Sequence, residues 1–477
     1  MNGDAKGTRL NGRFRLALKR GPIPPRQHPS FPMIYFSNRF RSGWLGLVAI
    51  LLAAVALIVP LDFARAGTPG LQITGDWEVE VAVPEQGRRV RLYVSPAVAV
   101  DVKDERLPSL EEWTFDKGAR RTKPAGVADP TNHGRFVLDR NSVTMRPTAE
   151  AGAPLYELGK DFEADREWGG LGRLRGGRIA AGQPVFVSYR YHQRRLDSVV
   201  LTPAGDLVLR AGPPRTGSPR PPSLLPGERR LANIWVQERL AKLGQEHLFP
   251  ILEEAFPEPA PQSPSPAERF FPQTLRRLQE GRTLRVLAWG DSVTGGYLGK
   301  DQWPHQLVSR LQARFPQAKI ELITAAWGGG NTRNFLTAPS GHPLAYADRV
   351  LAVKPDVVIS EFLNDSPLDA AETEARYRQV LADFRRIGAE WIIIAPHPST
   401  FTNPPAEREV DEDPRAYVKM IRRFAPENGV ALADATARYG RLWRQGLPWT
   451  TLMGNSANHP DERGMAIFVD SVLALLP

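Results

Sequence analysis

Apolar and polar residues alternate in several short segments of the first half of the chain. Residues 77–83 (Trp-Glu-Val-Glu-Val-Ala-Val) alternate as a strand with one buried face does. Residues 89–94, 185–191 and 206–210 repeat this pattern, and Gly and Pro residues typical of turns precede the last two segments. Short strands separated by turns are typical of a sandwich or a jelly roll. We therefore predict a β-sandwich accessory domain over residues 67–212.

From residue 283 onward the pattern changes to short apolar segments that alternate with amphipathic ones. The predicted strands are 284–289, 318–324, 355–360, 391–395 and 429–433, and the predicted helices are 302–315, 372–388 and 462–476. Strands that are nearly all apolar are buried on both faces, and their alternation with helices favours a parallel sheet covered on both sides. We therefore predict an α/β domain over residues 281–477.

Residues 213–280 separate these two domains and contain two proline-rich stretches, 213–227 and 257–266. Between the stretches, apolar residues recur mostly at threes and fours over 228–256, which is the spacing of a helix. The prediction for this section is therefore two linkers with a helical segment between them.

The first 66 residues have the pattern of a secretory leader. An apolar run over 44–59 follows two arginines and is followed by Ala-Arg-Ala at 64–66, a small-x-small cleavage site. The run is shorter than the roughly 20 residues of a membrane span. We expect an exported protein, periplasmic or extracellular. An uncleaved leader that anchors the protein to the membrane is the alternative, and Met33 is an alternative start.

Charge and composition then exclude several classes of function. The formal net charge is +10, but residues 1–66 hold ten Lys/Arg against two Asp/Glu, which leaves 52 basic and 50 acidic residues in the rest. This balance argues against a nucleic-acid partner. There is no cysteine, which excludes thiol catalysis and cysteine metal sites. No His, Asp or Glu spacing is typical of a metal site, so we expect neither metal nor cofactor.

Polar residues follow the predicted strands at the edge where ligands of a parallel sheet bind. A serine in a tight strand-to-helix turn exposes its hydroxyl for attack on a carbonyl, and its N–H near a helix N-terminus can stabilise an oxyanion. Glycines and a side-chain amide offer further donors, and a histidine offers a base. The segments after the first three strands are Gly290-Asp291-Ser292, residues 328–332 (Gly-Gly-Gly-Asn-Thr) and Asn364-Asp365. The histidine is in Asn458-His459-Pro460, in a loop just before the last predicted helix.

These four blocks, in this order, resemble the SGNH (GDSL-like) hydrolase family over about residues 281–477. The resemblance implies a flavodoxin-like three-layer α/β/α fold and ester hydrolysis through an acyl-serine. It implies that Ser292 is the nucleophile and His459 its general base. The oxyanion hole would then comprise the N–H groups of Ser292 and Gly330 and the side-chain amide of Asn364.

The layout is also similar to that of carbohydrate acetylesterases of this class that carry an N-terminal jelly roll. It implies removal of acetyl groups from a polysaccharide or cell-envelope glycan, with an acylated glycan or a small ester as substrate. Two alternatives stay open. One is an O-acyltransferase that acts on an exported polysaccharide, and the other is a glycan-binding protein with a degenerate hydrolase domain.

The sequence departs from the family pattern in two places. Most members carry Asp three residues before the histidine, where this chain has Ser456. Either a Ser-His dyad operates, with a backbone carbonyl or Asn455 holding the ring of His459, or an acid from elsewhere orients it. The second block also differs, which leaves Gly329 as an alternative donor to Gly330.

Four other polar residues near the predicted site are interpreted from their positions. We interpret Asp291 and Asp365 as residues that brace the loops, and Asp434, after the fifth strand, as structural. His397 follows the fourth strand within Ala-Pro-His-Pro. At the functional edge it could contact substrate, but we favour the interpretation that it lines a loop.

Overall fold

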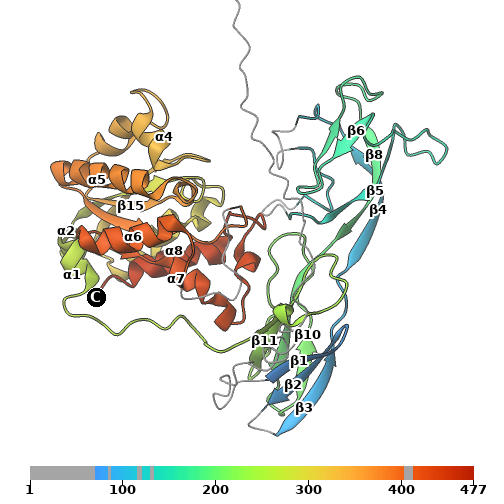
Figure 1. Cartoon of the computed structure of the whole chain (residues 1–477), viewed down its shortest axis with the longest axis horizontal. Helices are drawn as coiled ribbons and strands as arrows, with labels where there is room; N and C mark the ends of the chain where they lie inside the picture. Colours follow the sequence, from blue (N-terminus) through green and yellow to red (C-terminus); the bar gives the residue numbers. More distant parts are fainter. Residues whose placement is uncertain (1–69, 84–86, 115–120, 129–133, 402–411) are drawn as a thin grey trace, which may run out of the picture. The chain divides into compact units, whose positions relative to one another are not determined.

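A computed structural model of the chain describes residues 70–477 except 84–86, 115–120, 129–133 and 402–411 (Figure 1). The predicted leader over residues 1–66, with its alternatives of signal peptide and anchor, lies outside the described residues. Within them, no helix combines the length and the apolar character that a membrane crossing requires.

The C-terminal half contains a five-stranded parallel sheet with the order β14-β13-β15-β16-β17. Its strands are β13 (Thr283–Gly290), β14 (Lys319–Ala326), β15 (Val357–Glu361), β16 (Glu390–Ile394) and β17 (Ala431–Ala433). In chain order the sheet reads 2-1-3-4-5, which is the flavodoxin-like doubly wound order. The prediction of a parallel α/β domain is confirmed. The order reverses beside β13, so the carboxyl ends of β13 and β15 border the place where such sheets bind ligands.

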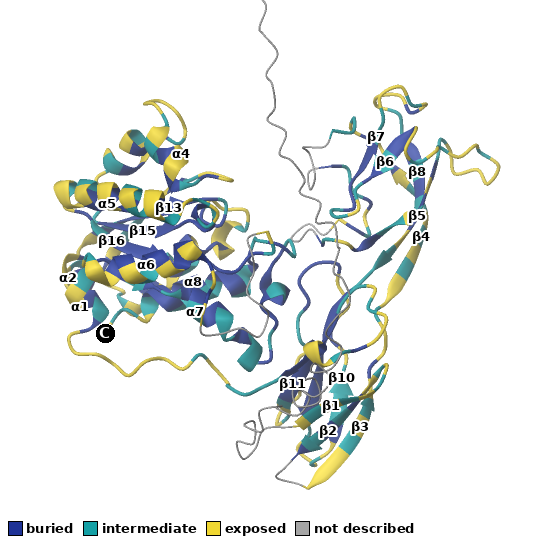
Figure 2. Ribbon diagram, in the orientation of Figure 1, coloured by how far each residue is buried: buried dark blue, intermediate teal, exposed yellow. Residues whose placement is uncertain are grey.

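Helices cover both faces of this sheet because successive side chains of a strand point to opposite sides. Leu284, Val286 and Ala288 of β13 belong to one core, whereas Leu287 and Trp289 belong to the other. The first core includes α1 (Pro266–Phe270), α2 (Pro272–Gln279), α3 (Trp303–Arg314), α7 (Ala435–Gly440) and α8 (Glu462–Leu473). The second includes α4 (Thr332–Thr337), α5 (Ala370–Ile387) and α6 (Ala416–Glu427). Figure 2 shows β15 and β16 buried and much of α5 exposed.

The N-terminal half is built from antiparallel sheets. A three-stranded sheet comprises β1 (Gly70–Gly75), β2 (Glu78–Val83) and β3 (Arg88–Tyr93). It shares a core with a four-stranded sheet of β9 (Arg195–Leu201), β10 (Leu207–Arg210), β11 (Arg229–Val236) and β12 (Leu248–Pro250). A second core lies around β4 (Ala99–Leu107), β5 (Leu138–Arg146), β6 (Phe162–Ala164), β7 (Leu171–Arg173) and β8 (Val185–His192). We call residues 70–250 the β region.

The prediction of a helix over 228–256 is wrong, because this segment forms strands β11 and β12. Strand β11 pairs with β9 on one side and with β12 on the other, and residues 231–236 are all buried. A strand buried on both faces shows no alternation, so its apolar spacing resembles that of a helix.

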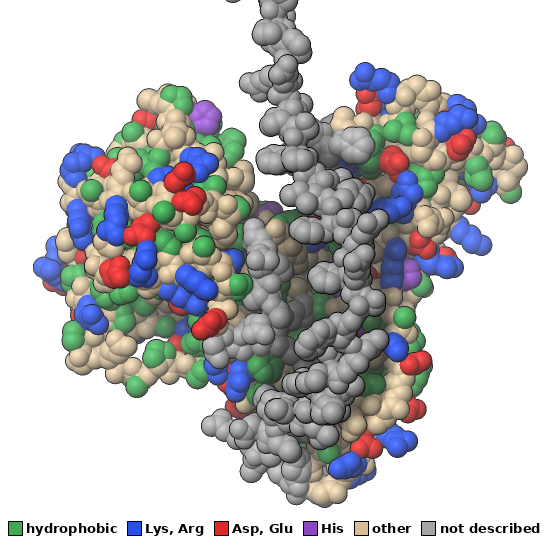
Figure 3. Space-filling model, in the orientation of Figure 1, with side chains coloured by type: hydrophobic (Ala, Val, Ile, Leu, Met, Phe, Trp, Pro, Cys, Tyr) green, Lys and Arg blue, Asp and Glu red, His purple; other side chains and the backbone are tan. Residues whose placement is uncertain are grey.

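The predicted domain boundaries also change. The β region continues past residue 212 to Pro250, and the proline-rich stretch 213–227 joins two strands of the same sheet. Helices α1 and α2 pack into the core of the α/β domain through residues such as Phe271 and Leu275, so this domain begins before residue 281. On the face drawn in Figure 3, basic and acidic side chains are intermixed over the α/β domain.

Candidate active site

Ser292 lies in the turn that follows β13. Gly290 ends the strand, and a Cβ at this position would lie 2.2 Å from Oγ1 of Thr294 and 2.3 Å from the carbonyl oxygen of Glu361. Only glycine therefore fits where the chain turns. The N–H of Gly295 donates to the carbonyl of Asp291 (2.9 Å), but α3 begins only at Trp303. The expected helix N-terminus at Ser292 is thus not present, and the turn itself exposes the hydroxyl.

Ser292 and His459 are brought together across the sheet edge. Oγ of Ser292 lies 2.9 Å from Nε2 of His459, which is hydrogen-bond distance, and both residues are partly exposed. With the imidazole neutral and its proton on Nδ1, the hydroxyl donates to Nε2. This is the contact that a serine nucleophile and its general base require.

Tyr297, a residue without a predicted role, packs on the imidazole of His459. The two rings are stacked, with centroids 4.7 Å apart and planes inclined by 25°. The phenol hydroxyl donates to the carbonyl oxygen of Pro460 (2.7 Å), so the tyrosine is attached to the same loop whose histidine it covers. No sequence pattern announces this contact, because it depends on how the two loops meet.

Asn455 shapes the loop that carries His459. Its Oδ1 accepts hydrogen bonds from the N–H groups of Ala457, Asn458 and His459, at 3.0, 2.9 and 2.9 Å. These bonds hold the backbone of the loop and not the imidazole ring. The side chain of Ser456, at the position of the family aspartate, accepts a hydrogen bond from Arg194 of the β region (2.8 Å).

Asn364 is held by the buried carboxylate of Asp291. Oδ2 of Asp291 accepts from Nδ2 of Asn364 (2.9 Å) and from its backbone N–H (3.1 Å), while Oδ1 accepts from the N–H of Val293 (2.9 Å). An amide has two N–H groups, so one remains for an oxyanion. For the N–H of Ser292, the structure shows no acceptor among the described residues.

Gly330 differs from its predicted role. Its N–H donates to the carbonyl oxygen of Trp327 (2.9 Å) within a tight turn, so in this conformation it is not free to bind an oxyanion. The neighbouring Gly328 and Gly329 are exposed, and a Cβ at either position would meet nothing within 4 Å. The backbone is therefore approachable at these two glycines.

Three buried acidic side chains lie beneath the site. Burial raises the pKa of Asp291 to about 7 and that of Asp365 to about 6. Asp365 accepts from the N–H and the hydroxyl of Thr332 (2.9 and 3.0 Å), so both aspartates brace loops. Burial also raises the pKa of Glu361 well above its usual value, and neither of its oxygens has a hydrogen-bond partner among the described residues.

His397 is buried beneath the loop that carries His459, as the loop-lining interpretation expects, and it offers no exposed surface for the substrate contact that was the other interpretation. The side chain is 0% exposed, and Nε2–H donates to the carbonyl oxygen of Asn458 (2.8 Å) behind the loop that carries His459. Burial lowers its pKa to about 3, so the ring is neutral near pH 7. Asp434 caps α7 through the N–H of Ala437 and pairs with Arg422, as its structural interpretation expects.

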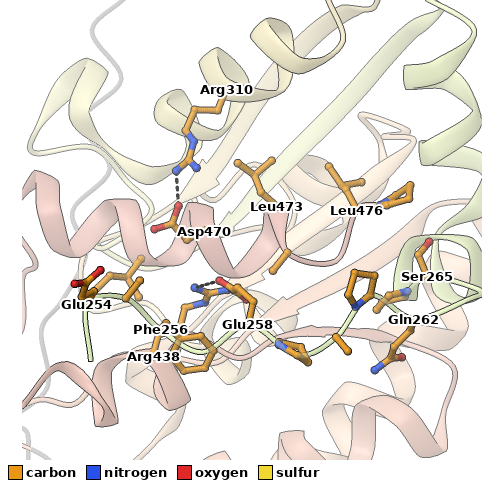
Figure 4. A pocket seen from close by; sticks show the side chains of 18 of the residues that line it. Glu254, Phe256, Glu258, Gln262, Ser265, Arg310, Arg438, Asp470, Leu473 and Leu476 are labelled. Carbon is orange, nitrogen blue, oxygen red and sulfur yellow. Dashed lines mark hydrogen bonds and ion pairs between the residues drawn. The ribbon is translucent and has the colours of Figure 1, made fainter. Parts of the chain in front are cut away.

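A pocket of about 700 Å³ lies away from these residues, between the segment that precedes α1 and the helices α7 and α8 (Figure 4). Two ion pairs border it, Arg310 with Asp470 and Arg438 with Glu258. Neither Ser292 nor His459 lines it. Across the described part of the chain, no group of three or more His, Asp or Glu side chains is arranged to hold a metal ion.

The model of one protein family matches most of the α/β domain. Residues 288–467 match the model of the GDSL-like Lipase/Acylhydrolase family. No curated protein sequence matched the chain.

Several solved structures are similar to part of the chain. A two-domain esterase (CEX) active on acetylated mannans is 20% identical, with 43% of this chain and 52% of that chain covered and a TM-score of 0.35. The chain thus spans about half the length of that esterase. An acetyl xylan esterase is 20% identical over 40% of this chain and 98% of its own, with a TM-score of 0.33. A variant of an acetyl xylan esterase from Geobacillus stearothermophilus is 19% identical over 40% and 94%, with a TM-score of 0.33.

Proposed function

From the premise that residues 288–467 form a GDSL-like lipase/acylhydrolase domain, we propose that this protein hydrolyses carboxylic esters through an acyl-serine on Ser292. The observation that carries the proposal is the 2.9 Å contact between Oγ of Ser292 and Nε2 of His459, at a partly exposed edge of the sheet. A nucleophile and a base in this contact are the minimal machinery of acyl transfer.

The reaction has two halves. His459 takes the hydroxyl proton while Oγ of Ser292 bonds to the ester carbonyl carbon. The N–H of Ser292 and the second N–H of Asn364 stabilise the oxyanion that forms. The tetrahedral species then collapses and expels the alcohol, which takes the proton from His459. In the second half, His459 deprotonates water, the hydroxide attacks the acyl-serine, and the acid leaves as Ser292 regains its proton.

For the substrate, we propose a small acyl group, such as acetyl, carried on a glycan. Three exposed aromatic side chains near the site support this. Tyr297 (40% exposed) stacks on His459, and Trp327 (48%) follows β14 and donates its N–H to the carbonyl of Gly290. Phe401 (54%) follows Thr400, whose N–H donates to the carbonyl of Ala457 in the loop of His459. Exposed aromatic rings are flat apolar surfaces against which sugar rings pack. An exported glycan esterase is also consistent with the predicted leader.

Hydrolysis of p-nitrophenyl acetate by the full chain, beside Ser292→Ala, tests the reaction. We expect activity in the wild type and loss of at least about 10³-fold in the variant, because the nucleophile is absent. Acetate release from acetylated xylan, peptidoglycan and lipid esters then tests the substrate. Turnover of lipid esters alone would contradict the proposal of a glycan substrate. Acetyl transfer to an added glycan would indicate the transferase alternative. Glycan binding without any ester cleavage would indicate a binding protein.

A further inference from the structure

The loop that carries His459 is attached to the β region through one buried arginine. Arg194, between β8 and β9, is 6% exposed, and its Nη1 donates to Oγ of Ser456 (2.8 Å) from 262 residues away in the sequence. Its Nη2 donates to the carbonyl oxygen of Arg135 (2.7 Å) and lies 2.9 Å from Oε1 of Glu238. A guanidinium holds its donors in fixed directions, so these contacts on the β-region side determine where Ser456 is bound.

Three consecutive residues of the loop are each held from outside. Arg194 holds Ser456, the N–H of Thr400 donates to the carbonyl of Ala457 (3.1 Å), and His397 donates to the carbonyl of Asn458 (2.8 Å). The β region reaches the second contact as well, because Nη1 of Arg135 donates to Oγ1 of Thr400 (2.6 Å). The two arginines are themselves joined by the bond from Arg194 to the carbonyl of Arg135.

Movement at Ser456 is transmitted to His459. Ser456 has a φ of +57°, a left-handed conformation that a residue other than glycine keeps only where its surroundings hold it. The next three N–H groups are bound together by Asn455, so residues 456–459 form one unit. The bond from Arg194 to Ser456 therefore helps to fix the imidazole relative to Ser292.

We propose that Arg194 is a positioning residue for the esterase reaction, and that the β region forms part of the active site through its bond to Ser456. The proposal rests on the proposed function. A reaction that needs its nucleophile and base in contact slows steeply when either is displaced, whereas substrate binding by other residues is unaffected. Loss of the bond should therefore lower kcat and leave KM nearly unchanged.

Variants at Ser456 separate positioning from folding. Ser456→Ala removes the acceptor but leaves the pair of Arg194 and Glu238 in place, whereas Ser456→Asn keeps an acceptor and tolerates a left-handed backbone. We expect kcat to fall about tenfold to a hundredfold in Ser456→Ala and to recover largely in Ser456→Asn. Ser218→Ala is the matched control, because it removes another serine hydroxyl bond between the β region and the α/β domain, to the carbonyl of Met453 (2.9 Å). Its kcat should match that of the wild type.

A double-variant cycle with Arg194→Ala completes the test. If the two side chains act through one bond, Arg194→Ala with Ser456→Ala should be no slower than Arg194→Ala alone. Wild-type kcat in Ser456→Ala, or additive losses in the double variant, would overturn the proposal and leave the esterase intact. If the wild type cleaves no ester, the proposed function fails instead. Amide hydrogen exchange of residues 454–459 then decides: faster exchange in Arg194→Ala supports the positioning role, and unchanged exchange overturns it.

Discussion

Asp291 holds the side-chain amide of Asn364, with 2.9 Å between Oδ2 of the aspartate and Nδ2 of the asparagine. The aspartate immediately precedes Ser292, so the turn that presents the nucleophile also orients a candidate oxyanion donor. The buried carboxylate accepts backbone bonds from both loops, which connects the carboxyl ends of β13 and β15.

This relationship predicts that Asp291→Asn impairs catalysis through Asn364. The amide that Asp291→Asn introduces has N–H groups of its own, and these would face the N–H donors of Val293 and Asn364 that the carboxylate accepts. Asn364 would therefore lose its orientation. We expect kcat to fall about 10²-fold, the range seen when one oxyanion donor is removed. Asn364→Ala should cause a similar loss, and the double variant should lose little more. Steady-state kinetics measures these values, and fully additive losses would contradict the link.

Glu361 predicts a pH-dependent stability. Its pKa is raised in the folded protein, so folding favours its protonated form. The contribution of Glu361 to stability is therefore fully present below the unfolded pKa near 4.5, and it is lost as the pH rises toward the folded pKa. Glu361→Gln replaces this carboxyl with a group that never ionises. Each pH unit within the window should lower the unfolding free energy of the wild type by about 1.4 kcal/mol relative to the variant.

Urea unfolding of the wild type and Glu361→Gln at pH 5 and pH 8 measures this difference. The free energy of unfolding of the variant should increase relative to that of the wild type between pH 5 and pH 8. A constant difference between the two proteins at both pH values would show that Glu361 ionises in the folded state as it does in the unfolded chain.

Tyr297 predicts that stacking on His459 supports the rate. Tyr297→Phe keeps the ring and loses only the bond to the carbonyl of Pro460, so kcat should stay within about threefold of the wild type. Tyr297→Ala removes the ring surface that limits rotation of the imidazole, and kcat should fall about tenfold. Kinetics on p-nitrophenyl acetate compares the two variants, and equal rates would show that the ring has no part in catalysis.

His397 predicts a loss of stability without a change in substrate binding. His397→Ala leaves the buried carbonyl of Asn458 without its donor and opens a cavity beneath the loop. The free energy of unfolding should fall by about 2–4 kcal/mol. KM should not change, because the ring does not reach the surface. A raised KM in a folded variant would instead indicate that His397 contacts the substrate.

Local patterns were enough to determine the α/β domain. Buried parallel strands are apolar throughout, and the polar residues that end them lie at the ligand-binding edge, so Ser292 and Asn364 can be predicted there from the strand pattern. His459 is predicted instead from its resemblance to the family block in the loop before the last helix. The apolar strands and each of the blocks are local patterns of residues that are close in sequence. The alternating strands of the β region are predictable for the same reason.

Tertiary packing decided the rest. Strands β11 and β12 are buried on both faces, which removes the period that would distinguish them from a helix. His397 follows β16 and His459 lies in the loop before α8, but only packing decides which of the two is covered. The bond of Arg194 to Ser456 joins residues 262 positions apart, and the stacking of Tyr297 on His459 joins two loops. Such contacts leave no periodic pattern in a single sequence, because each depends on where the folded backbone brings distant side chains together.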